Sequence, residues 1–307
     1  MAIPWVCGER WYSDASYYQA IATQMAREGG GAWWSPMQGD LPYFNKPPLA
    51  FWMHGALVKA FGDADWAAHL PEGVAFVGVC LLAAWLARRL HGPLVGVLAG
   101  CVMALTNDWI VRVGNFKLDA LHTLFVFGAI ACWVRACVPA HGDGRVDAGA
   151  PVRGAPWGTF VGAGVLLGAA LMTKPFYGLG AAALVLPWLW WMGLLTARRA
   201  AQIGMSVAIG MLIATPWYAS MVARYGHAFV QAHVHEQTVQ RAAGEMHDAQ
   251  SWTWYLKLIA GTLDESIEPR KMWLIYAAAV AGMIVVALRR RDRGTWVGGS
   301  LAALWLV

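Results

Sequence analysis

The chain has 307 residues, of which 58% are hydrophobic and only 13% are charged. A soluble domain carries roughly 25% charged residues, so this composition excludes an ordinary water-soluble protein and indicates a chain embedded in lipid. The formal net charge is +5. A basic balance can indicate a nucleic-acid partner, but the basic residues here are clustered at membrane boundaries, so we expect membrane lipid and no nucleic acid as a partner.

Residues 1–65 form a polar and aromatic segment that precedes the first apolar run. Within it, a helix is predicted from Asp14 to Arg27, where three glycines follow. Residues 49–61 are apolar but too short to span a bilayer, which predicts a helix lying at the membrane surface. Residues 1–20 contain no apolar core preceded by basic residues, so no cleavable signal peptide is expected.

Seven apolar runs are long enough to cross the hydrocarbon layer, which takes roughly 20 residues. A spanning segment must satisfy its own backbone hydrogen bonds, so the runs predict helices and not strands. They lie at 66–90, 93–111, 118–138, 157–173, 176–195, 201–222 and 272–288, and an eighth begins near Trp296. The predicted fold class is all-α, a polytopic transmembrane helical bundle with about eight spans. Its predicted divisions are a first loop (1–65), six spans (66–222), a second loop (223–271) and further spans (272–307).

Arginine clusters fix the orientation of the bundle. They comprise Arg88, Arg89, Arg135, Arg145, Arg153, Arg198, Arg199, Arg289, Arg290, Arg291 and Arg293. Counting crossings places every cluster on one side, which is the cytoplasm by the positive-inside rule. The first and second loops then lie on the opposite side. Because a first loop of this length needs a further span to deliver it, and because the chain stops abruptly at Val307, we expect a fragment of a longer chain or a misassigned start.

Two aspartates stand where helices begin on the non-cytoplasmic side. Asp14 starts the helix of the first loop, and Asp119 stands at the mouth of the third span. A carboxylate there can act as a base or orient an acceptor, and an ionisable residue at the edge of a membrane helix is a functional candidate by default. Helix capping explains either residue equally simply, so both interpretations stay open.

Two lysines precede prolines on the same side. Lys46 stands before a Pro-Pro pair that keeps the backbone extended and fixes where the lysine points. It is placed to meet a lipid phosphate as a point charge, although ordinary snorkelling toward headgroups is an equal alternative. Lys174, before Pro175, is a weaker phosphate candidate, because no phosphate-loop glycines precede it.

The second loop carries His233-Val234-His235-Glu236 and Arg241. The guanidinium of Arg241 offers a fork of donors that matches phosphate oxygens, so it is a candidate phosphate clamp. Two histidines two residues apart in a loop are weak evidence for a metal, so no metal ligand is assigned and a divalent cation stays open. Nucleotide-binding and nucleophile motifs are missing from the sequence, which disfavours soluble nucleotide-sugar chemistry.

In their order along the chain, these motifs resemble the membrane glycosyltransferases that use polyprenyl-phosphate sugars. This GT-C group contains the protein O-mannosyltransferases and the aminoarabinose transferase of lipid A. The matching elements are Asp14, Lys46-Pro47-Pro48-Leu49, Trp66-Ala67-Ala68-His69-Leu70-Pro71, Asp119, Met172-Thr173-Lys174-Pro175, Pro216-Trp217-Tyr218 and Arg241. Two positions depart from the family: Ala15 replaces the second acid of an Asp-Glu pair, and Asn45 stands where the lipid A branch often has an acidic residue that helps to hold a metal.

The resemblance implies a GT-C-like bundle in a bacterial inner membrane, with a cavity open to the periplasm. It implies inverting transfer of a sugar from a polyprenyl-phosphate donor to lipid A or a protein hydroxyl, with the phosphate held by Lys46, Arg241 and Lys174. Asp14 would orient or deprotonate the acceptor, and Asp119 would support it. A transporter or flippase of lipid-linked intermediates, or an inactive fragment, is the alternative, although transporters usually carry polar residues at mid-membrane on broken helices.

Overall fold

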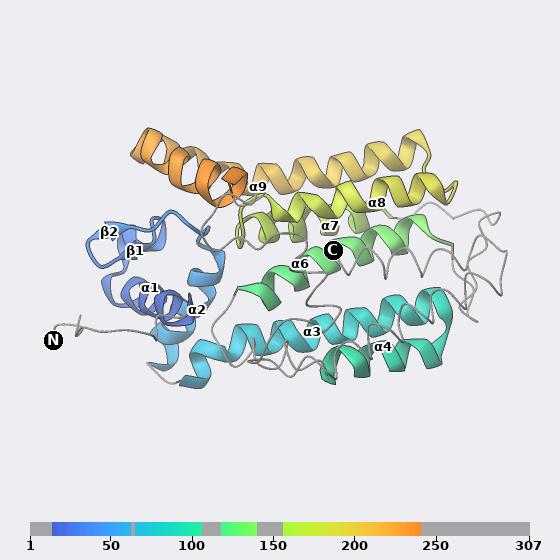
Figure 1. The fold of residues 1–307 in the computed structure, drawn as a ribbon, viewed down its shortest axis with the longest axis horizontal. Coiled ribbons are helices and arrows are strands. Elements are labelled where there is room, and N and C mark those ends of the chain that lie inside the picture. The colour runs from blue at the N-terminus through green and yellow to red at the C-terminus, as the bar shows by residue number, and fades with distance from the viewer. Residues whose placement is uncertain (1–13, 63–64, 106–117, 140–155, 241–307) are drawn as a thin grey trace, which may run out of the picture.

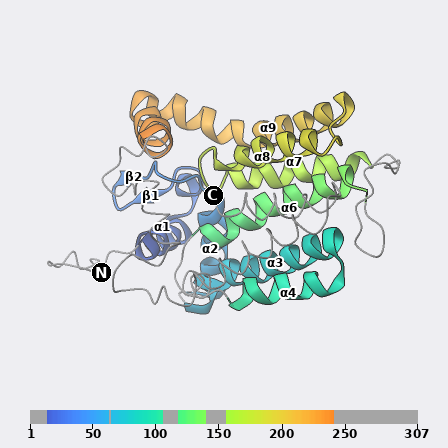
Figure 2. The ribbon, with the colours of Figure 1, turned by 45° about the vertical axis from the view of Figure 1, so that its right-hand side comes forward.

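The computed structural model describes residues 14–62, 65–105, 118–139 and 156–240. The helices of its bundle run side by side along the longest axis of the molecule (Figure 1). They are α3 (Asp65–His91), α4 (Pro93–Leu105), α6 (Asp119–Cys137), α7 (Trp157–Leu171), α8 (Gly180–Trp191) and α9 (Ala197–Phe229). Two further helices, α1 (Asp14–Glu28) and α2 (Leu49–Phe61), gather with a small hairpin at one end of the bundle, as both views show (Figure 2).

Apart from two strands of two residues each, the described residues fold into helices and turns, which confirms the predicted all-α class. Three helical segments are long and apolar enough to cross a membrane: 69–91, 119–137 and 197–240. The other expected spans in this part are apolar but shorter, with 13 residues in α4, 15 in α7 and 12 in α8. The spans predicted at 272–288 and near Trp296 lie outside the described residues.

The helix α9 continues past its predicted end at residue 222. It reaches Phe229, with a kink at Gly226 where φ is 54°, and a π-helix (Val230–Gln240) follows directly. Hydropathy falls after residue 222, but Phe229 is fully buried in a cluster with Trp217 and with Phe44 of the first loop. Tertiary packing therefore sustains a helix where the sequence pattern predicts a loop.

A hairpin in the first loop fixes the chain on its way to Lys46. Strand β1 (Met37–Gln38) pairs antiparallel with β2 (Leu41–Pro42), and the turn between them uses Gly39 with φ of 62°. The side-chain amide of Gln24 on α1 holds this glycine at both ends, donating to its carbonyl at 2.8 Å and accepting from its N–H at 3.0 Å. The hairpin is thus fastened to α1.

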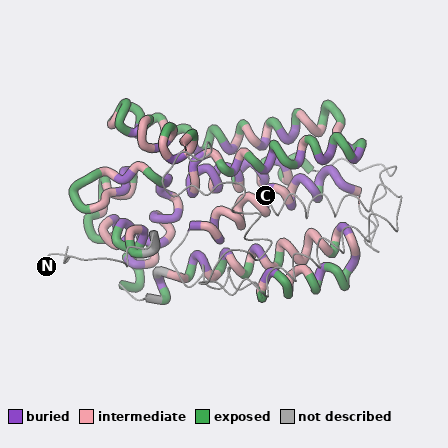
Figure 3. The backbone as a smooth tube through the Cα atoms, viewed as in Figure 1, coloured by how far each residue is buried: buried purple, intermediate pink, exposed green. Residues whose placement is uncertain are grey.

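Small residues let α7 and α9 approach closely, as is common between membrane helices. A Cβ atom added at Gly210 would lie 2.9 Å from Leu167 Cβ and 3.2 Å from the carbonyl oxygen of Gly164. Buried residues line the inward faces of the bundle, and exposed apolar residues cover the outer faces (Figure 3). Outward apolar surface is what lipid contact requires, because lipid tails are as apolar as leucine.

Arg89 and Arg135 lie at the end of the bundle opposite the first loop. Arg89, at the end of α3, donates to the carbonyl of Arg135 at 3.3 Å and to that of Val138 at 2.9 Å, both at the C-terminal end of α6. Asp119 stands at the other end of the same helix. The candidate site therefore lies at the end away from these arginines.

Candidate functional site

An ion pair joins α6 to the turn that follows α7. The Lys174 ammonium donates to Asp119 Oδ1, and the two side chains are 24% and 34% exposed. Asp119 is the first residue of α6, whose N-cap position is held by Leu118 without a side-chain cap. Asp119 is therefore not the N-cap of this helix, although the first turn favours a negative charge.

The turn after α7 presents Lys174 to α6. The N–H of Lys174 donates to the carbonyl of Ala170 at 3.0 Å, which completes the last turn of the helix. Pro175 cannot continue the helical hydrogen bonding, and Phe176 takes a left-handed conformation with φ of 51°. The chain turns away at this point, because neither residue fits a continuing helix.

Lys46 lies on an extended segment beside this turn. Two prolines follow it, and the N–H of Leu49 donates to the carbonyl of Met172 at 3.0 Å, which ties the segment to the end of α7. The Lys46 side chain is only 8% exposed, and its ammonium donates to Gln237 Oε1 at 3.3 Å. Lys46 is therefore a buried cation, and not a surface lysine that snorkels toward headgroups.

His233 on the π-helix holds the same segment. Its Nδ1 donates to the carbonyl of Phe44, and its Nε2 lies 3.3 Å from the hydroxyl of Tyr218, so both ring nitrogens have partners. His235 points outward and is exposed. The side chains of His233 and His235 therefore do not point toward a common site. Within the described ranges, no group of three His, Cys, Asp or Glu side chains could hold a metal ion.

His122 belongs to this site and was missed in the sequence. It lies one turn after Asp119 on α6, and its Nδ1 donates to the carbonyl of Ala170 at 3.3 Å. The N–H of Lys174 bonds to the same carbonyl, so His122 lies beside the turn that carries Lys174. Its spacing of three residues from Asp119, on one helix face, is the signal that could have found it.

Glu72 on α3 was missed as well. Its side chain is fully buried, and its Oε2 accepts from the N–H of Leu121 at 3.2 Å. Asp119 and Lys174 act on the carboxyl group electrostatically. A carboxylate inside an apolar membrane run is a functional signal by itself.

The histidine of α2, His54, carries no positive charge. His54 is fully buried, and its Nδ1 donates to the carbonyl of Ala50 at 2.6 Å. Burial lowers the pKa of His54 to about 4, so the ring is neutral at physiological pH. Among the described residues of the candidate site, the positive charge therefore comes from Lys46 and Lys174.

Two predicted site residues cannot be placed with the others. Helix α1 begins at Asp14, but the side chain of Asp14 lies outside what the structure describes. Arg241 directly follows the π-helix and also lies outside the described residues. The roles assigned to Asp14, Lys46, Asp119, Lys174 and Arg241 stay predictions.

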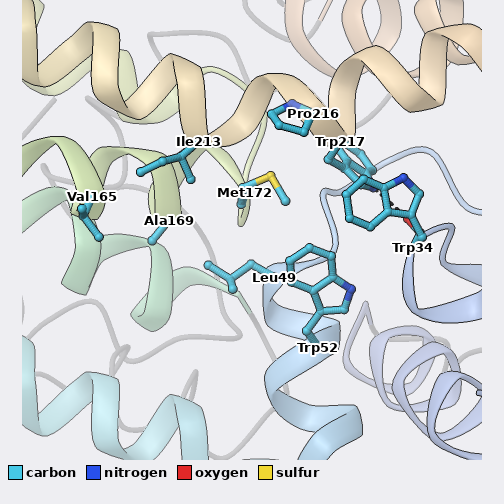
Figure 4. A pocket seen from close by; sticks show the side chains of 9 residues that line it. All are labelled: Trp34, Leu49, Trp52, Val165, Ala169, Met172, Ile213, Pro216 and Trp217. Atoms are coloured by element: carbon cyan, nitrogen blue, oxygen red, sulfur yellow. Dashed lines mark hydrogen bonds between the residues drawn. The ribbon is translucent and has the colours of Figure 1, made fainter.

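An apolar pocket of about 230 Å³ opens between α2, α7 and α9 (Figure 4). Tryptophans line one end and smaller side chains line the other: Trp34, Trp52 and Trp217 against Val165, Ala169 and Ile213. Leu49 and Met172, whose backbone bond ties the Lys46 segment to α7, line it as well. The pocket therefore adjoins the segment that carries the buried lysine.

The family model and the similar curated proteins are all sugar transferases that use lipid-phosphate-linked sugars. A family model described as dolichyl-phosphate-mannose-protein mannosyltransferase matches residues 2–230. Similar curated proteins are undecaprenyl phosphate-alpha-4-amino-4-deoxy-L-arabinose arabinosyl transferases. That of Edwardsiella ictaluri is 29% identical over 92% of this chain and 47% of its own length. That of Erwinia tasmaniensis is 27% identical over 97% and 49%. The chain spans about half the length of the curated relatives it matches.

Among solved structures, ArnT from Cupriavidus metallidurans bound to undecaprenyl phosphate matches with a TM-score of 0.74 at 20% identity, covering 96% of this chain and 50% of that one. Its apo state matches with a TM-score of 0.71. A polytopic helical bundle with this likeness has the GT-C fold of membrane glycosyltransferases. Since the family model covers most of its length, the chain belongs to the dolichyl-phosphate-mannose-protein mannosyltransferase family.

Proposed function

We propose that this protein is an inverting glycosyltransferase that moves a sugar from a polyprenyl-phosphate donor to an acceptor at the periplasmic face of a bacterial inner membrane. The observation that carries the proposal is that the Lys174–Asp119 ion pair and the segment of the buried Lys46 both lie at the end of α7, beside an apolar pocket. Fixed cations in a partly buried site stabilise a developing phosphate charge more strongly than they would in water. The curated relatives that use undecaprenyl phosphate support the same class of donor.

The polyprenyl chain and the phosphate of the donor would bind at two adjoining places. The branched and aromatic lining of the pocket suits a polyprenyl chain, because burial of apolar surface contributes roughly 25 cal/mol per Å². The phosphate would then meet Lys46, with Arg241 as a second clamp and Lys174 as a third cation. Lys46 leads this set because it is buried and sits three residues before Leu49, which lines the pocket.

The transfer itself breaks the bond between the anomeric carbon and a phosphate oxygen, and the electron pair leaves with the phosphate. The oxygen of an acceptor hydroxyl attacks the opposite face of the sugar, which inverts the anomeric centre. Its proton passes to Asp14 as general base, while Asp119 supports the acceptor or Asp14. Lipid A is the first acceptor to test, and a protein hydroxyl is the second.

The charges at the two ends of the bundle indicate how it is oriented in the membrane. Arg89 and Arg135 meet at the end opposite Asp119. The positive-inside rule assigns the arginine end to the cytoplasm. The first loop, the ion pair and Lys46 would therefore face the periplasm, where lipid-linked sugars are presented to acceptors.

The test compares the full-length protein with Asp14→Asn in membrane vesicles, using undecaprenyl-phosphate-linked aminoarabinose as donor and lipid A as acceptor. We expect the variant to lose transfer by about a hundredfold, as removal of a general base does. Asp40→Asn is the matched control, because Asp40 is an exposed acid in the hairpin turn of the same loop. Equal transfer by wild type and Asp14→Asn would leave Asp14 only a structural role in the first turn of α1. Movement of donor across the membrane without transfer would identify a transporter.

A further inference from the structure

Glu72 is an ionisable side chain whose presence the stability of the bundle does not explain. It follows Pro71 in α3, inside an apolar segment that is long enough to span the membrane, and its side chain is fully buried. Its Oε1 has no hydrogen-bond partner among the residues that the structure describes. A buried carboxyl group with an unused oxygen costs free energy that an apolar residue of the same size would not.

What Glu72 touches is the start of α6. Its Oε2 accepts from the N–H of Leu121, in the first turn of that helix. The helix has no side-chain cap of its own, since Leu118 occupies the N-cap position. A carboxyl group from α3 thus satisfies a backbone donor that α6 leaves open, at the end of the helix that favours negative charge.

The turn that Glu72 holds begins with Asp119, the partner of Lys174. Both members of that ion pair act electrostatically on the Glu72 carboxyl. The pair joins two separate elements, the first residue of α6 and the turn after α7, so its geometry depends on where α6 begins.

We propose that Glu72 is a positioning residue: by capping the first turn of α6 from α3, it holds Asp119 in register with Lys174. Its importance for catalysis rests on the proposed function, but its effect on the ion pair does not. The two consequences can be measured separately.

The experiment uses the full-length protein in membrane vesicles, with Glu72→Met and Glu72→Gln beside wild type. Methionine fills a similar volume but removes the acceptor, whereas glutamine keeps a carbonyl oxygen for the N–H of Leu121. An amine-reactive reagent labels exposed lysines, and peptide mass spectrometry gives the labelling rate of Lys174 relative to Lys59, an exposed lysine on α2. Transfer kinetics and thermal midpoints are measured on the same preparations.

We expect Glu72→Met to raise the Lys174 to Lys59 labelling ratio by about fivefold, the factor set by one ordinary hydrogen bond. It should also lower kcat more than it raises KM. Glu72→Gln should restore both values toward wild type. Ser206→Ala is the control for a lost buried contact elsewhere, since Ser206 on α9 donates to the carbonyl of Phe160 at 2.8 Å. That variant should lower the thermal midpoint and leave the labelling ratio unchanged.

A labelling ratio in Glu72→Met equal to that of wild type would overturn the proposal, and so would a glutamine variant that behaves like the methionine one. If the ratio rises as expected but no donor gives transfer in wild type, the proposed function fails while the positioning role of Glu72 is supported.

Discussion

Lys174 and Asp119 are hydrogen-bonded across 55 positions of the chain, and this bond connects the turn after α7 with the first residue of α6. Both side chains are partly exposed, so solvent screens their attraction and the pair contributes little to the stability of the fold. Under the proposed function, the pair would hold Lys174 where it can meet the donor phosphate. Its loss should therefore be felt in transfer and not in folding.

The first prediction is a double-mutant cycle on this pair. Asp119→Asn and Lys174→Met should each lower kcat/KM for transfer by about tenfold, and the double variant should lose little more than the worse single variant, because coupled residues are not additive. Thermal midpoints should stay close to wild type. Lys59→Met, which removes an exposed charge on α2, is the control. Fully additive losses would mean that the two residues act independently.

The second prediction concerns the buried lysine. Lys46→Met should weaken binding of undecaprenyl phosphate by about tenfold to a hundredfold, the range for hydrogen bonds to a charged group. Gln237→Leu removes only the neutral partner of the Lys46 ammonium, so its effect should be smaller. Native mass spectrometry of the protein with increasing lipid measures both affinities. An unchanged affinity in Lys46→Met would remove this lysine from the phosphate site.

The sequence predicted the bounds of a helix well where residues next to its ends determine them. The helix predicted at 49–61 is α2 with the same bounds, because Pro48 precedes its apolar run and Gly62 ends it with φ of 77°. The continuation of α9 to Phe229 was not predictable, because it depends on packing against Phe44, which lies far away in the chain.

The same contrast holds for the site. The order of motifs singled out Lys46, Asp119 and Lys174, but could not say that the last two form an ion pair, because that pairing depends on how α6 packs against α7. Glu72 was missed because one carboxylate in a long apolar run hardly changes mean hydropathy. Its partner, the N–H of Leu121, is a backbone group that no sequence pattern marks.

The third prediction tests the pocket with two changes on one helix. Val165 lines the pocket and Val161, one turn earlier on α7, does not, although both side chains are exposed. Val165→Phe should fill part of the pocket and raise KM for an undecaprenyl donor by about tenfold, since a group that no longer fits costs roughly 1–3 kcal/mol. Val161→Phe should leave KM unchanged. For a donor with a much shorter prenyl chain, Val165→Phe should raise KM less. An equal rise in KM would mean that the pocket does not bind the lipid tail.

The last prediction separates packing from helix propensity on α9. Gly204 is exposed with nothing within 4 Å of an added Cβ, so Gly204→Ala should maintain or raise stability, by up to about 1 kcal/mol. At Gly210 the same methyl group would lie 2.9 Å from Leu167 Cβ and 3.2 Å from the Gly164 carbonyl. That carbonyl is backbone and cannot retreat unless α7 moves, so Gly210→Ala should cost about 1–3 kcal/mol. Thermal unfolding in detergent compares the two variants. Because α7 ends at the turn that presents Lys174, Gly210→Ala should also lower transfer, and a variant as stable and active as Gly204→Ala would show that the contact between α7 and α9 does not position the site.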